Sequence, residues 1–239
     1  MYKGESFGLW RPWTGIAYGW ADPDSARERL QTKRQRQIRL TRSPFAGMSS
    51  MWASDPHTLP CYSPRVAWRM VARATDTRSF IAALLQPFIL SAHHNYLLFF
   101  PDSDHAREEA YLLGVTCSMP FDWHARLWVE ANFTANVVKP FPVPSATRDD
   151  RTRRVVEQIA GRLAAIDERF AEWAKNVGVP IGPVSDDEKS EMLAELDAAV
   201  AVLYRLDEKD LQIIYGTFHE GADYSSHEER VVAHLRKLQ

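Results

Sequence analysis

A helical periodicity in the last third of the chain most restricts the fold. Between residues 153 and 178, large apolar side chains recur at steps of three and four, which places them along one side of an α-helix. Gly178 supplies a C-terminal stop. Ser185 and Glu188 have the spacing of a capping box, and further helices are expected after Asp207 and from Ser226. Residues 146–239 are therefore expected to be helical. The apolar residues of the first helix are Val155, Ile159, Leu163, Ile166, Phe170 and Trp173.

Strand-like spacing marks the middle of the chain. Apolar and basic residues alternate over residues 65–71, so Val66 and Trp68 are expected on one face of a strand. Arg65 and Arg69 are expected on the other face, exposed to solvent. Further strands are expected over residues 79–87, 88–100 and 132–144, with helix over 105–132. Short strands and a tight turn are expected near the beginning, over residues 1–23.

These segments together predict the fold class. A mixed α/β domain over residues 1–145 is followed by a helical domain over residues 146–239, so the chain is expected to be α+β. The boundary is placed near Ser145, where a Pro-rich stretch ends and the composition changes.

Charge is unevenly distributed along the chain. The formal net charge is −2, but residues 1–145 hold 16 Lys and Arg against 12 Asp and Glu. Residues 27–42 carry seven basic side chains and one acid, on a stretch that is expected to be helical from Asp22 or Asp24. Such a helix is either a solvated charged surface or a site that contacts nucleic-acid phosphates. Lys33, Arg34 and Arg36 are the candidate phosphate-binding residues.

A second basic cluster belongs to the strand at residues 65–71 and the turn that follows it. Local pattern alone favours a solvated sheet face, on which arginine stems cover apolar neighbours. The sharper hypothesis is an anion-binding surface made by Arg65, Arg69, Arg73 and Arg78. His93, His94 and Asn95 interrupt the next apolar run and are weaker candidates for base contact, with a polar loop tip as the simpler interpretation.

Motifs for catalysis are missing from the chain. There is no GxGxxG, no GxxxxGK(S/T), no HExxH and no GxSxG. Cys61 and Cys117 stand far apart without metal-ligand spacing, and adjacent histidines point to opposite faces of a strand, so no metal site is expected. No apolar run is long enough for a membrane span and no signal peptide is recognised, so we expect a cytoplasmic protein without a membrane partner.

The order of four segments resembles the C-terminal part of large adenine-N6 DNA methyltransferases: type IIG restriction–modification enzymes and their relatives in BREX and DISARM phage defence. The first segment is YKGESFGLWRPWTGIAYGWADP and the second is PRVAWRMVARATDTRSFIAALLQP. The third, EEAYLLGVTCSMPFDWHARLWVEANFTANVVKPFPVP, carries an LLG and an FDW motif. The fourth combines RLAAIDERFAEWAKNVGV with AELDAAVAVLYRLDEKDLQIIYGTFHEG.

This resemblance implies a function in DNA recognition. The first three segments would form a TaqI-like specificity domain, which is the target-recognition domain of that family, and the fourth a helical tail beside it. The family's cofactor fold and its catalytic Asn/Asp-Pro-Pro-Tyr/Phe tetrapeptide do not occur in this chain. We therefore expect a recognition portion with no catalytic residue and no bound cofactor of its own, although the full-length family uses S-adenosylmethionine.

Three functions remain open at this point. The chain is expected to bind double-stranded DNA, with phosphate contacts positioning it and a few side chains reading base edges. Alternatively it is a protein-interaction subunit that docks on a separate methyltransferase chain and has little DNA affinity alone. An independent enzyme such as a metal nuclease is the third possibility, and it requires ligands that the sequence does not offer.

Overall fold

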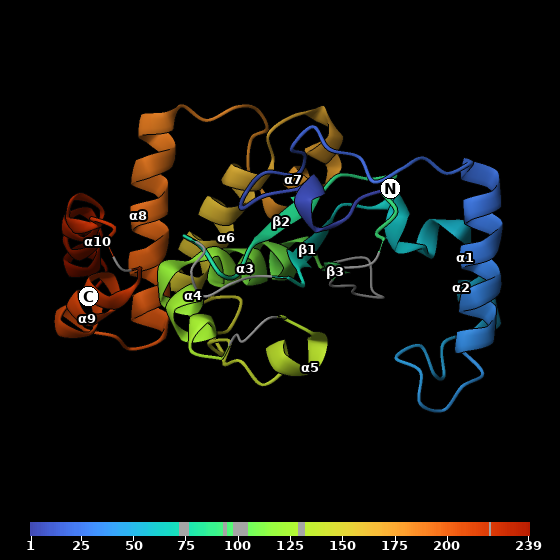
Figure 1. The fold of residues 1–239 in the computed structure, drawn as a ribbon, viewed down its shortest axis with the longest axis horizontal. Helices are drawn as coiled ribbons and strands as arrows, with labels where there is room; N and C mark the ends of the chain where they lie inside the picture. Colours follow the sequence, from blue (N-terminus) through green and yellow to red (C-terminus); the bar gives the residue numbers. More distant parts are fainter. Residues whose placement is uncertain (72–76, 93–94, 98–104, 129–131, 220) are drawn as a thin grey trace.

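A small antiparallel sheet lies in the middle of the molecule, with helices on one side of it and toward both ends of the long axis (Figure 1). The computed structural model describes residues 1–71, 77–92, 95–97, 105–128, 132–219 and 221–239. Within these residues the sheet has three strands in the order β2-β1-β3. They are β1 (Arg65–Arg69), β2 (Ala82–Leu85) and β3 (Asn95–Leu97). The predicted α+β fold, with a helical C-terminal region, is confirmed.

Both faces of β1 are covered, which corrects the expectation of a solvent-exposed basic face. Val66 and Trp68 point into the main core, together with Ala82 and Leu84 of β2. Ala67, on the opposite face, packs with Tyr2 and Phe7 from the beginning of the chain. This N-terminal segment covers the second face and half-buries Arg69, which donates to the Phe7 carbonyl. Arg65 is buried among the carbonyls of residues 60, 63 and 89.

Helix α3 (Ala106–Cys117) packs on the sheet, and α4 (Met119–Arg126), α6 (Arg151–Ala164) and α7 (Ala171–Val177) pack against α3. Helix α3 packs against β2 and α6. Gly114 permits the close approach of α3 to α6, because a Cβ atom at this position would lie 2.6 Å from Cγ1 of Val156. The main core contains residues on both sides of Ser145. The division into domains 1–145 and 146–239 stays a prediction, and a shared core crosses its boundary.

The C-terminal helices α8 (Asp186–Leu203), α9 (Glu208–Thr217) and α10 (Ser225–Leu238) lie at one end of the long axis (Figure 1). Ser185 caps α8 as predicted, and Asp207 caps the predicted helix α9; both side chains accept hydrogen bonds from first-turn amides. Buried Asp197 of α8 accepts hydrogen bonds from the Met119 amide and the Tyr215 hydroxyl, so it ties α4 and α9 to α8.

The opposite end carries α1 (Pro23–Gln37) and the short α2 (Ser50–Ser54), drawn in blue and cyan at the right of Figure 1. The 3-10 helices η2 (Pro56–Thr58) and η3 (Pro60–Tyr62) follow α2 in the chain, whereas η1 (Gly4–Ser6) packs against β1. The strongest contacts of α1 are with α2, so the two helices form an arm, which we define as residues 23–58. The predicted start of α1 at Asp22 is confirmed by its capping hydrogen bond from the Ser25 amide.

Three expectations about local structure were wrong. Residues 132–144 contain the short helix α5 (Ala135–Val138), since the prolines at 140, 142 and 144 lack the amide donors that a strand needs. The helix expected over 153–178 is interrupted after α6 by the turn η4 (Glu168–Phe170), because the Asp167 side chain accepts a hydrogen bond from the Arg169 amide. Residues 1–23 form isolated bridges in place of strands.

Candidate nucleic-acid interface

Helix α1 carries five Lys and Arg side chains, more than any other helix that the structure describes, and its beginning is set by ordinary helix signals. Asp22 caps it, Pro23 occupies the first turn and Asp24 lies near the positive end of the helix dipole. Asp24 is paired with Arg27 at 2.7 Å, so this first turn is electrically balanced. The unbalanced positive charge begins one turn later.

Arg34 belongs to the interior of the arm. Its side chain is 4% exposed, and its guanidinium carbon lies 5.1 Å from the Phe45 ring centroid and 4.4 Å from that of Trp52. Its Nη1 also donates to the carbonyl and the hydroxyl of Thr58. Burial lowers the pKa of Arg34. The geometry makes Arg34 the attachment of α1 to the rest of the arm, which corrects its predicted assignment as a phosphate contact.

The other face of α1 presents a stripe of exposed cations. Arg29, Lys33 and Arg36 follow one another at steps of four and three, which places them along one side of the helix. All three are exposed, and none has an ion-pair partner among the residues that the structure describes. They line an open hollow along α1 that also includes Leu40. We call Arg29, Lys33 and Arg36 the basic stripe.

A cavity of about 520 Å³ lies between α1 and the body of the molecule. The α1 wall includes Ala26, Arg29 and Leu30. The opposite wall includes Pro60, Cys61, Arg65 and Leu90. Arg29 and Leu30 line both this cavity and the hollow under the basic stripe, so the two spaces adjoin.

Arg65 forms part of the cavity wall and is almost fully enclosed, at 3% exposure. Its guanidinium donates to the backbone carbonyls of Pro60, Ser63 and Ile89. Desolvation lowers the pKa of Arg65 to about 10. It therefore holds η3 and the segment after β2 against β1, and it cannot extend to a phosphate as the sequence had suggested.

Arg69 and Arg78 are also tied to the protein. Arg69 donates through Nε and Nη2 to the Phe7 carbonyl, so it fastens the N-terminal segment over β1. Arg78 forms an ion pair with Asp122 at 2.6 Å and donates to the Cys117 carbonyl, also at 2.6 Å. Arg78, like Arg65 and Arg69, therefore holds parts of the protein together. Its partner is Asp122, the Asp of the FDW motif.

Four candidate residues remain, and the structure describes only one of them. Arg73, His93 and His94 lie outside the described residues. The backbone of Asn95 pairs with that of Arg69 at the end of β3. Of the ten candidates, Lys33 and Arg36 share one surface, and Arg29, which sequence reasoning had not singled out, joins them. The spacing 29, 33, 36 was the signal that could have identified it.

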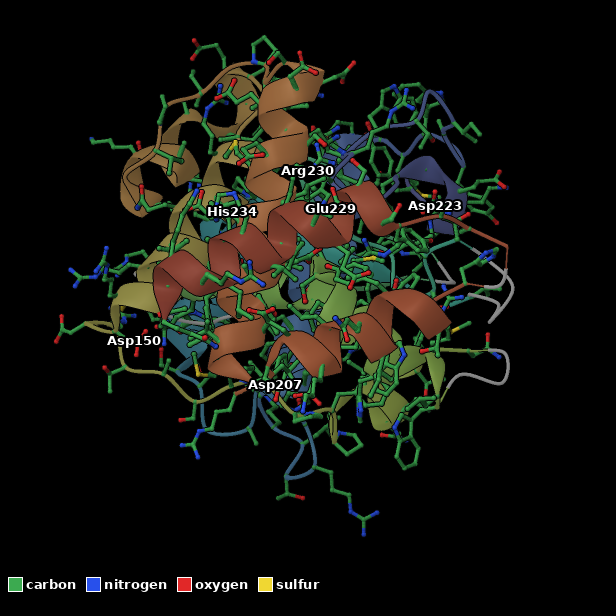
Figure 2. The ribbon with its side chains drawn as sticks, turned by 90° about the vertical axis from the view of Figure 1, so that its left-hand side faces the viewer. Asp150, Asp207, Asp223, Glu229, Arg230 and His234 are labelled. Atoms are coloured by element: carbon green, nitrogen blue, oxygen red, sulfur yellow. The ribbon has the colours of Figure 1, made fainter. Side chains whose placement is uncertain are left out.

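The end of the molecule opposite α1 is acidic. Figure 2 looks onto this end, where α10 crosses with Glu229 and His234, and Asp223 and Asp207 lie near the beginnings of α10 and α9. Residues 186–239, which contain α8, α9 and α10, hold 13 acids against six Lys and Arg. A polyanion is therefore attracted to the α1 end and repelled by the other end.

No protein-family model, curated protein or solved structure matches this chain. Among the described residues, no helix combines the length and the apolar character needed to cross a membrane. In the same part of the chain, no cluster of three or more His, Cys, Asp or Glu side chains is arranged to hold a metal ion.

Proposed function

We propose that this chain is the DNA-recognition portion of a site-specific adenine-N6 DNA methyltransferase of a restriction–modification or phage-defence system, acting in the cytoplasm. It binds duplex DNA and leaves methyl transfer, with its S-adenosylmethionine, to a catalytic region outside this sequence. The observation that carries the proposal is the basic stripe. Its three cations are exposed and without ion-pair partners in the described structure, on a helix that buried Arg34 holds in place.

The dimensions of the stripe suit a DNA backbone. Arg29 and Arg36 are seven residues apart, which is about 10 Å along a helix. Each strand of B-DNA presents one phosphate about every 3.4 Å of axis, so the stripe spans the axial rise of about three phosphates. Contacts of this kind position the protein and carry no sequence information. For base reading, the candidates that remain are Arg73, His93, His94 and Asn95.

Fluorescence anisotropy with a labelled duplex, titrated at several salt concentrations, tests the proposal. Three phosphate contacts contribute a slope of about −2.7 to the dependence of log K on log salt. The variant Arg29→Gln/Lys33→Gln/Arg36→Gln should lose most of that slope and most of the affinity. The control is Arg151→Gln/Lys175→Gln/Lys237→Gln, which removes the same charge from exposed positions on other helices. Equal losses in both variants, or no binding at low salt, would refute the proposal.

A second function is favoured by exposed apolar side chains near the base of the arm. Trp20 is 90% exposed and Phe88 is 75% exposed, and Met51 of α2 is 85% exposed. Such side chains are typical of protein contacts, which agrees with a subunit that docks on a separate methyltransferase chain. This function predicts co-purification with a separately encoded methyltransferase, reduced by Trp20→Ser/Phe88→Ser, and weak DNA binding by the chain alone.

A further inference from the structure

We propose that the cavity between α1 and the body admits one unpaired nucleotide of the DNA whose phosphates lie on the basic stripe. This inference rests on the proposed function and deepens it, because it identifies the preferred nucleic acid as a duplex with a displaced or bulged base. The cavity adjoins the stripe through Arg29 and Leu30, which line both spaces. A strand held along α1 can therefore present a base to the cavity without leaving the stripe.

The size of the cavity agrees with one nucleotide. At about 520 Å³ it lies within the range of pockets that enclose small organic ligands. A duplex about 20 Å across has no room in such a space, whereas one base with its sugar does. A smaller space of about 250 Å³ lies next to it and shares Ala26, Leu30, Cys61 and Leu90 as lining residues.

The walls suit a flat, mostly apolar ring. Ala26 and Leu30 of α1 lie on one side, and Pro60, Ile89 and Leu90 on the other. Aliphatic surface of this kind is buried favourably by a base that has left its stack, since each base has an apolar face. Cavities lined only by polar side chains would offer a displaced base no such advantage over water.

Charge fixes the direction in which the nucleotide would enter. Arg29 stands where the cavity meets the basic stripe, so the phosphate is expected there. Asp22 and Ser25 lie at another part of the lining, and the Asp22 carboxylate can accept a hydrogen bond from an amino group of a base.

The first experiment compares two labelled duplexes of the same sequence, one perfectly paired and one with a single bulged adenine, by anisotropy at fixed salt. The binding free energy gained by burying one base should make the bulged duplex bind at least about fivefold more tightly than the paired one. Ala26→Leu places a larger side chain in the cavity and should remove this preference while leaving affinity for the paired duplex unchanged. Ala46→Leu, at an exposed loop position away from the cavity lining, is the matched control.

The second experiment works on the unmodified protein. Cys61 lines the cavity and is half-buried, whereas Cys117 is fully buried, so alkylation of the folded chain reports on Cys61. Burial raises the pKa of the Cys61 thiol, so labelling is carried out at mildly alkaline pH, with Cys61→Ser as the blank. The bulged duplex should protect Cys61 from iodoacetamide, and the paired duplex at the same occupancy should protect it less.

The outcomes separate this inference from the proposed function. Salt-dependent binding with equal affinity for both duplexes and equal protection of Cys61 would overturn the nucleotide site and leave the DNA-binding function in place. Protection by free deoxyadenosine monophosphate without any preference for the bulged duplex would also overturn it, because the cavity would then serve a free ligand. No binding of either duplex at low salt would overturn both.

Discussion

The Nε atom of Arg78 donates to Oδ2 of Asp122 across 2.6 Å, and this ion pair joins the chain before β2 to α4. Asp122 is completely buried, and it also accepts hydrogen bonds from the amides of Ser79 and Phe80. A single carboxylate therefore neutralises a guanidinium and satisfies two backbone donors that would otherwise be buried without partners. Arg78 and the FDW motif, which lie 44 residues apart in the chain, thus meet at the Asp122 side chain.

Asp122→Ala is expected to lower the free energy of unfolding by about 3–5 kcal/mol, because it leaves a buried positive charge and two amides without an acceptor. Urea denaturation followed by circular dichroism measures the loss. Asp149→Ala, at an exposed position before α6, should change stability by less than about 0.5 kcal/mol. Similar losses in the two variants would show that the ion pair does not stabilise the fold.

Arg34→Ala is expected to loosen the arm without unfolding the core. Loss of the two ring contacts and of the hydrogen bonds to Thr58 should lower the free energy of local opening of the arm by about 1–2 kcal/mol. Chymotrypsin should then cleave near Phe45 and Trp52 roughly tenfold faster. Arg36→Ala, at an exposed position of the same helix, should leave the cleavage rate unchanged and weaken DNA binding. Equal cleavage of both variants would contradict the assignment of Arg34 to the interior of the arm.

Glu109→Gln is expected to alter the dependence of stability on pH. Glu109 is 2% exposed and accepts a hydrogen bond from Trp173 Nε1 at 2.8 Å, and burial raises its pKa from 4.5 to about 8. The folded state then binds a proton that the unfolded chain releases, so this group's contribution falls as pH rises from 4.5 to about 8.

The amide of Gln cannot ionise, so the variant should lose this component. Its stability relative to the parent should rise by up to roughly 1.4 kcal/mol per pH unit across that window. Urea denaturation of both proteins at a series of pH values measures the difference. A difference that is constant with pH would mean that Glu109 titrates as it does in the unfolded chain.

Gly114→Ala is expected to destabilise the protein by about 1–3 kcal/mol, because the added methyl group meets Val156 and separates α3 from α6. Val156→Ala in the same chain should recover part of the loss by making room. The matched control is Gly216→Ala in α9, where no atom beyond the adjacent residues and the helix's own backbone lies within 4 Å of the added group. That control should be neutral or more stable by about 0.5–1 kcal/mol, measured by thermal denaturation.

Local signals in the sequence predicted the helices well, and long-range contacts account for most of what it missed. The structure confirms the predicted helix ends at Asp22, Ser185, Asp207 and Gly178. Such ends can be predicted because capping depends on residues within one turn. The half-burial of Arg69 depends on Phe7 folding over β1 from 62 residues away, and nothing near Arg69 in the sequence reveals that contact.

The difference in exposure between Lys33 and Arg34 is also decided by long-range contacts. The two side chains are neighbours on α1 and differ by about 100° around the helix axis, so one faces solvent and the other faces α2. Which of them points inward is decided by Phe45 and Trp52, which are 11 and 18 residues further along. The sequence thus predicted a basic helix correctly, while the choice of its binding face required the structure.

The separation of charge between α1 and the α8–α10 end gives the molecule an electric dipole along its length. In the field of a polyanion this dipole experiences a torque, which turns the arm forward before any atom makes contact. Orientation during diffusion raises the association rate and has little effect on dissociation. Removal of acids at the far end, more than 100 residues from α1 in the chain, would therefore weaken this orienting torque while leaving every contact in the complex intact.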